Sequence, residues 1–151
     1  MRYFALFLIL NFAALAIGGL FTKDGVASIW YQSLHKAPWT PPGWVFGAAW
    51  TTIMVCFSVF MANAWCATDD RKKIGLRYAL QWILNVSWNP LFFHQHAVLA
   101  GLGVITSLLV LVVALLWWYR KQSPLNWIWI SPYAVWLVIA TSLNAYIYWM
   151  N

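Results

Sequence analysis

The stretch that decides the fold reads Trp30-Tyr31-Gln32-Ser33-Leu34-His35-Lys36-Ala37-Pro38-Trp39-Thr40-Pro41-Pro42-Gly43-Trp44, and it leads into an apolar run that carries Phe46 and Trp50. Four tryptophans, one tyrosine and three prolines lie between positions 30 and 50. Each proline fixes its own φ near about −65° and biases the preceding residue toward an extended conformation. The pattern therefore predicts a stiff aromatic loop that forms a lid or a pocket wall, not a flexible tether.

The composition of the chain around this loop is that of a membrane protein. Of its 151 residues, 64% are hydrophobic and 8% are charged, and the mean hydropathy is +0.70. A soluble domain has about 25% charged residues. The nine basic residues behind the net charge of +6 lie at the ends of apolar runs, which excludes a nucleic-acid-binding face. We therefore expect one membrane domain over residues 1–151.

Five apolar runs approach the length of about 20 residues that crosses the hydrocarbon core of a bilayer. Because lipid cannot satisfy backbone polar groups, such runs are expected to be helical. Arg2 before the first run also resembles a signal peptide, but we expect no cleavage because the run is near spanning length. The predicted fold is an all-α integral membrane protein, a bundle of five transmembrane helices with a structured loop between the first two, at residues 3–20, 45–65, 74–93, 98–119 and 127–149.

The distribution of Lys and Arg predicts the orientation of these spans. The N-terminal side of the first span and the loops after the second and fourth spans share one side of the membrane. The opposite side carries only Lys23 and Lys36. The positive-inside rule then predicts a bacterial cell-membrane protein with its N-terminus inside and its C-terminus outside. The basic residues of the inner side are Arg2, Arg71, Lys72, Lys73, Arg77, Arg120 and Lys121.

Polar residues inside two spans are candidates for a site. Gln81, Asn85 and Asn89 recur every four residues and share one helix stripe. They either hold the helices together by hydrogen bonds or line a cavity, since unpaired amides are costly in a bilayer. Pro90 follows them and is expected to disturb the helix.

A second candidate face lies on the last span. Tyr133, Trp136, Ala140 and Asn144 are spaced by three, four and four residues. This face either packs against neighbours or leaves room for a flat guest beside the small Ala140. Pro132 either starts the regular helix or kinks it.

The other chemistry-bearing residues predict no catalytic or metal centre. His35, His94 and His96 fall on one predicted side, but no set of cysteines or carboxylates completes a metal site there. The chain has three carboxylates in total, none of them inside a predicted span, and no phosphate-binding glycine motif. We therefore expect no metal and no required cofactor.

Three ordered motif blocks resemble the translocator protein/tryptophan-rich sensory protein family. The first is Trp30-Tyr31-x-x-Leu34-x-Lys36 with Trp39-x-Pro41-Pro42, Phe46 and Trp50. The second is Leu84-Asn85-x-x-Trp88-x-Pro90-Leu91-Phe92-Phe93. The third is Pro132-Tyr133-x-x-Trp136-x-x-x-Ala140-x-x-Leu143-Asn144. The blocks cover nearly the whole chain. In two departures from the family pattern, Ala37 stands where a proline commonly follows the lysine, and Asn89 stands where threonine often precedes the proline.

The resemblance implies a homodimer with a cavity that opens toward the first loop and binds porphyrin or haem-type tetrapyrroles. Some members also bind sterol-like molecules and benzodiazepine-site ligands. Carried over by position, the expected ligand-binding residues are Tyr31, Trp39, Phe46, Trp50, Asn89, Trp136, Ala140 and Leu143.

Three functions follow from the sequence as hypotheses. The first is a membrane receptor, sensor or carrier for flat ligands such as protoporphyrin IX or haem. The second, implied by some relatives, is enzyme-like oxidative degradation of bound protoporphyrin IX. The third is a regulatory membrane partner that docks through small-residue faces such as the one carrying Gly103 and Ser107.

Overall fold

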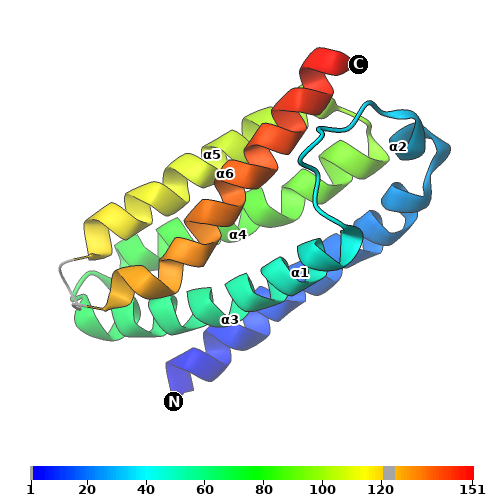
Figure 1. Cartoon of the computed structure of the whole chain (residues 1–151). Helices are drawn as coiled ribbons and strands as arrows, with labels where there is room; N and C mark the ends of the chain where they lie inside the picture. Colours follow the sequence, from blue (N-terminus) through cyan, green and yellow to red (C-terminus); the bar gives the residue numbers. More distant parts are fainter. Residues whose placement is uncertain (1, 121–124) are drawn as a thin grey trace.

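A computed structural model describes residues 2–120 and 125–151, and all the regular secondary structure in them is helical (Figure 1). This confirms the prediction of an all-helical chain. Two short elements join the long ones: α2 at Ile29–Ser33, and a π-helical turn, η1, at Pro90–His94. The five long helices are α1 (Arg2–Ala27), α3 (Gly43–Ala67), α4 (Arg71–Asn89), α5 (Val98–Tyr119) and α6 (Asn126–Met150).

Four of the long helices, α1, α3, α5 and α6, are long and apolar enough to cross a membrane. Helix α4 is not in this group, because four basic residues lie in its first two turns and amides lie on its buried face. The predicted boundaries of the spans at 45–65, 98–119 and 127–149 agree with α3, α5 and α6 within two residues.

Two regular helices end at other residues than the predicted spans. Helix α1 continues to Ala27 instead of ending near residue 20, because its last turns pack against η1. Gly25 permits this contact: a Cβ atom there would overlap the ring of Phe93. The regular third helix ends at Asn89 instead of residue 93, because Pro90 has no N–H to continue the α-helical pattern. The next residues form the π-helical turn, in which the Gln95 backbone N–H donates to the Pro90 carbonyl at 3.0 Å.

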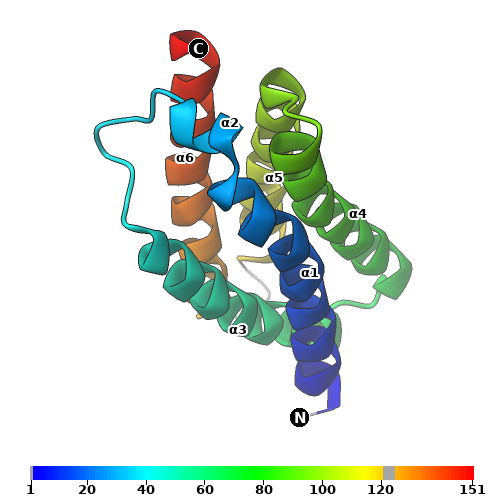
Figure 2. The same cartoon turned by 90° about the vertical axis from the view of Figure 1, so that its right-hand side faces the viewer.

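The long helices pack side by side in the order α3, α1, α4, α5 and α6, and α6 returns to α3 (Figure 2). Consecutive helices α3 and α4 make little contact, because α1 lies between them. The turn between α3 and α4 and the end of α5 lie at one end of the molecule. Helix α2, the loop after it and η1 lie at the other end, which we call the loop end (Figure 1).

Fully buried aromatic side chains fill the interior away from the loop end. Phe57 and Phe60 of α3 stack with ring centroids 5.8 Å apart, and the Tyr133 ring of α6 meets Phe57 edge-on at 5.3 Å. All three are 0% exposed.

Hydrogen bonds between side chains tie this interior together. Asn11 of α1 donates to the Ser58 hydroxyl of α3 at 2.9 Å and accepts from the Tyr78 hydroxyl of α4 at 2.8 Å. Gln81 of α4 donates to the Tyr133 hydroxyl of α6 at 2.8 Å. The Asn11 amide therefore joins three helices through two hydrogen bonds, and the bond from Gln81 to Tyr133 fixes α4 against α6.

Candidate functional site

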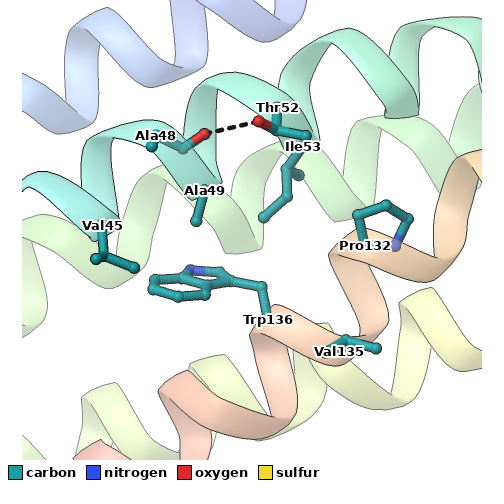
Figure 3. Close-up of a pocket in the computed structure, with 8 residues that line it drawn as sticks. All are labelled: Val45, Ala48, Ala49, Thr52, Ile53, Pro132, Val135 and Trp136. Atoms are coloured by element: carbon teal, nitrogen blue, oxygen red, sulfur yellow. Dashed lines mark hydrogen bonds between the residues drawn. The ribbon is translucent and has the colours of Figure 1, made fainter. Parts of the chain in front are cut away.

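A groove of about 410 Å³ opens between the first half of α3 and the middle of α6 (Figure 3). Small side chains on α3 line this space: Ala49 points toward Trp136, and Ala48 and Thr52 lie at the outer edge of the groove (Figure 3). The Thr52 hydroxyl donates to the Ala48 carbonyl one turn earlier at 2.8 Å, so the O–H bonds within α3 and not into the groove. The groove is therefore mainly apolar, lined by Val45, Ala48, Ala49, Thr52, Ile53, Pro132, Val135 and Trp136.

Trp136 forms the wall of this groove that has hydrogen-bonding capacity. Its indole lies between the two helices with the nitrogen edge toward Ala49 (Figure 3), and the residue is 6% exposed. Its Nε1–H has no hydrogen-bond partner within the described residues. Four other residues also have a buried polar side-chain atom without a partner within the described residues, and none of them lines the groove: Trp65, Gln81, Asn126 and Thr141. A buried donor without a partner is costly unless a ligand or water accepts from it.

Aromatic rings extend the site on both sides of Trp136. Phe46 meets the Trp136 ring edge-on, with centroids 5.3 Å apart. Trp50, one turn further along α3, meets Tyr133 at 6.0 Å in the same manner. Ala140 lies one turn after Trp136 and packs on the same core. Of the predicted residues, Trp136 alone lines the groove; Phe46 contacts its ring, and Trp50 and Ala140 pack in the surrounding core.

Pro132 lies inside α6, six residues after its start, and not in its first turn. Its ring lines the groove opposite Ile53 (Figure 3). Of the two alternatives for Pro132, the one in which it starts the regular helix is therefore wrong.

The loop between α2 and α3 lies along the last turns of α6. The Trp39 indole N–H donates to the Ser142 hydroxyl at 3.2 Å, and its ring meets Tyr146 edge-on at 5.3 Å. The Asn151 side-chain oxygen accepts from the His35 backbone N–H at 2.9 Å. Within the loop, the buried Ala37 gives its carbonyl to the Thr40 N–H at 2.9 Å, so the residue that departs from the family pattern anchors a turn.

Tyr31 belongs to a separate aromatic cluster at the loop end. Its ring packs beside Phe93, with centroids 5.5 Å apart, and beside Phe92. The Lys36 Nζ lies 4.5 Å from the centre of the Tyr31 ring, a cation–π contact. Burial raises the pKa of the Tyr31 phenol above its ordinary value, which keeps it neutral at physiological pH.

Asn89 faces α1 and not the groove. Its side-chain oxygen accepts from the Thr22 hydroxyl at 2.8 Å, and its amide nitrogen lies where a Cβ on Gly18 would come within 2.6 Å. Asn144 likewise ties helices together: it accepts from the Trp88 indole at 3.0 Å and donates to the Val98 carbonyl at 3.2 Å. Of the two alternatives for the polar stripe, Gln81 and Asn89 therefore fit hydrogen bonding between helices and not the lining of a cavity.

The remaining predicted residues lie further along α6 or in turns. Leu143 is buried one turn beyond Ala140. His96, at φ 54°, stacks on Trp30 at 4.0 Å and an interplanar angle of 15°, while His94 lies beside Phe21.

The sequence motifs did not predict the residues of α3 that line the groove. A signal for them was present in the sequence: Ala48, Ala49 and Thr52 form one small-residue face at spacings of one and three residues. Only the crossing of α3 and α6 shows that this face lies opposite Trp136.

Comparison with known proteins agrees with this architecture over nearly the whole chain. Residues 6–150 match the model of the TspO/MBR family. The chain is 34% identical to the Tryptophan-rich protein TspO of Archaeoglobus fulgidus, over 92% of each chain. It is 29% identical to the Protein CrtK of Rhodobacter capsulatus, over 98% of this chain and 92% of the relative. It is also 33% identical to the Translocator protein of Homo sapiens, over 81% of this chain and 74% of the relative. The chain therefore belongs to the TspO/MBR family.

Proposed function

We propose that this membrane protein is a receptor, sensor or carrier that binds a flat, largely apolar tetrapyrrole such as protoporphyrin IX or haem in the groove between α3 and α6. The observation that carries the proposal is the Trp136 indole, which is buried against an open groove with its N–H unpartnered within the described residues. A carbonyl or carboxylate of a bound molecule would accept from it.

The size and lining of the groove support a ligand of this class. Its volume of about 410 Å³ falls within the range of about 300–1,000 Å³ that is usual for small-molecule sites. Stacking of a macrocycle on an aromatic ring adds about 0.5–1.5 kcal/mol per ring beyond the burial of apolar area. Trp136 lines the groove, and Phe46, which meets its ring edge-on, would offer a second such contact. Sterol-like molecules would use the same apolar surface and compete for it.

In this proposal the loop between α2 and α3 acts as a lid. Trp39 is 54% exposed and is attached to α6 by one hydrogen bond and one edge-on ring contact, so its release breaks few contacts. Lys36 and His35 lie in the same loop and would meet the propionates of a porphyrin at the mouth.

A titration of the purified protein with protoporphyrin IX, followed by the Soret band, tests the proposal. We expect Trp136→Ala to raise the dissociation constant about tenfold or more, since ring contact and hydrogen bond are both lost. Trp127→Ala is the matched control, because Trp127 is an exposed tryptophan of the same helix in its first turn. An unchanged dissociation constant for Trp136→Ala would sink the assignment.

Oxidative degradation of the bound porphyrin is the second candidate function. Trp50, Tyr133 and Trp136 place oxidisable rings within one cluster at the groove. Illuminated porphyrin would act as photosensitiser and dioxygen as oxidant. Faster loss of the Soret band with native protein than with heat-denatured protein would support catalysis, and equal rates would refute it.

We also propose that α4, together with η1, forms the fifth transmembrane span in a bacterial cell membrane, with the N-terminus inside. The excess of basic residues at the end opposite the loop supports this orientation, although Lys121 lies outside the described residues. Cys66, exposed at the end of α3, offers a test: a membrane-impermeant maleimide should label it only after the cells are permeabilised.

A homodimer completes the proposal. Gly103 on α5 has open space where a Cβ would stand, so a second copy can approach this helix closely. Light scattering of the protein in detergent should give the mass of two chains, and the mass of one chain would refute the dimer.

A further inference from the structure

Basic side chains gather at the end of the molecule opposite the loop end. The start of α4 and the end of α5 lie together there (Figure 1), and the two helices pack against each other. Besides Arg2 at the start of α1, five basic residues of α4 and the end of α5 belong to this end, against the two carboxylates Asp69 and Asp70. The Asp70 carboxylate caps α4 by accepting from the Lys73 backbone N–H at 3.0 Å. The basic residues are Arg71, Lys72, Lys73, Arg77 and Arg120.

Two of these arginines, Arg77 and Arg120, pack against aromatic rings of α5. The Arg77 guanidinium carbon lies 3.7 Å from the centre of the Trp118 ring, and its Nη1 donates to the Tyr119 hydroxyl at 3.1 Å. The Arg120 guanidinium lies 3.3 Å from the centre of the Trp117 ring. A guanidinium placed over a ring keeps its N–H groups at its edge, where they can donate to another acceptor. We call Arg77, Arg120, Trp117, Trp118 and Tyr119 together the arginine–aromatic surface.

Arg77 lies deeper than the basic residues at the start of α4. Six residues separate it from Arg71, which corresponds to about 9 Å along the helix axis. At that depth its immediate neighbours are Leu76, which is 73% exposed, and the partly exposed Trp118. Its contacts with Trp118 and Tyr119 supply no negative charge, and a cation near the hydrocarbon boundary is costly without a counter-charge.

We propose that the arginine–aromatic surface binds the phosphate headgroup of an anionic phospholipid from the surrounding bilayer. The planar edge of each guanidinium matches two phosphate oxygens, and the aromatic rings fix its orientation before binding. Trp117 and Trp118 are 61% and 46% exposed, so they offer apolar faces to the upper part of an acyl chain. The lipid would supply the negative charge and the apolar contact that this surface lacks.

The proposal differs from a general attraction of basic residues to the membrane surface. Such attraction depends on charge alone, so lysine would serve as well as arginine. Binding through the guanidinium edge depends on the planar fork, on the Trp118 face and on the Tyr119 hydroxyl. Arg77→Lys therefore separates the two, because it keeps the charge and removes the fork.

Native mass spectrometry of the purified full chain in detergent, titrated with dioleoyl phosphatidylglycerol or dioleoyl phosphatidylcholine, tests the proposal. We expect preferential binding of phosphatidylglycerol, weakened about tenfold by Arg77→Gln and about threefold or more by Arg77→Lys. Lys36→Gln, at the loop end, removes one positive charge as a matched control and should leave the affinity within about twofold. Inorganic phosphate at equal concentration should not displace the lipid.

Several outcomes would overturn the inference. Equal binding of the two lipids would show that no anionic headgroup is recognised. Wild-type affinity in Arg77→Lys would show that charge alone attracts the lipid, and displacement by inorganic phosphate would show a free-anion site instead. If Arg77→Gln does not fold, Tyr119→Phe provides the decisive variant: it removes only the hydroxyl that positions Arg77, and wild-type affinity there would equally refute the assignment.

Discussion

The two halves of α3 meet α6 in opposite ways. Toward its C-terminal end, α3 places Phe57 and Phe60 against the rest of the bundle, and both are completely buried. Toward its N-terminal end, α3 places Ala48 and Ala49 opposite Trp136, and a groove of about 410 Å³ remains. The contact between α3 and α6 is therefore close-packed in the C-terminal half of α3 and open in its N-terminal half. Side-chain size along α3 differs between the two levels: phenylalanines stand where the contact is closed, and Ala48 and Ala49 where the groove is open.

Each half has a buried donor without a partner within the described residues: Trp136 Nε1 beside the groove and Trp65 Nε1 near the end of α3. In the closed half, Asn11 joins the hydroxyl groups of Ser58 and Tyr78, so each group has a partner. In the open half, the Trp136 N–H has none within the described residues. A satisfied buried network stabilises one structure, whereas a buried donor without a partner carries a desolvation cost.

The largest expected effect concerns the stability of the closed half. Phe57→Ala should lower the free energy of unfolding by about 3–5 kcal/mol, because it removes a fully buried ring that contacts three other aromatic rings. Val45→Ala, at the groove, should lower it by less than about 1.5 kcal/mol, since Val45 is only partly buried. Unfolding in detergent followed by circular dichroism measures both. An equal decrease in the free energy of unfolding for the two variants would contradict the difference in packing between the two halves of α3.

An intermediate effect is expected when the groove is filled. Ala49→Leu should weaken protoporphyrin IX binding about tenfold while changing the free energy of unfolding by less than about 1.5 kcal/mol, because the added methyl groups enter open space. The matched control is Ala62→Leu, which fills a second groove of about 380 Å³ between α1 and α3. Soret titration of both variants decides the matter. If Ala62→Leu weakens binding as much as Ala49→Leu, the ligand does not occupy the α3–α6 groove.

The smallest effect is expected at the loop. Ser142→Ala removes the acceptor of the Trp39 indole and should cost about 0.5–1.5 kcal/mol of loop attachment. The dissociation rate of bound porphyrin should then rise a few-fold, while the thermal stability of the helices stays the same. Stopped-flow exchange of the ligand measures the rate. Ser107→Ala on α5, whose hydroxyl donates only to its own helix, is the control and should leave the rate unchanged.

Part of the site was predictable from the sequence, because motif residues on one helix keep their spacing in any packing. Trp136 and Ala140 share a face of α6 by their spacing of four residues, and Phe46 and Trp50 do so on α3. Asn89 shows the limit of this reasoning. Periodicity placed it on the stripe with Gln81 and Asn85, but α1 lies close enough for Thr22 to donate to it. Which neighbour a polar stripe meets depends on helix order, which periodicity does not contain.

The sequence by itself determined the all-helical class, the approximate ranges of the helices α3, α5 and α6, and the position of the aromatic loop. Apolar length and proline position act locally, so they can be read from the chain. The tertiary structure decided the rest. It extended α1 to Ala27 through the contact of Gly25 with Phe93, and turned Asn89 toward Thr22. It also set the small face of Ala48 and Ala49 opposite Trp136 to make the groove. These features depend on which helices meet and at what level, and such contacts join residues that are far apart in the sequence.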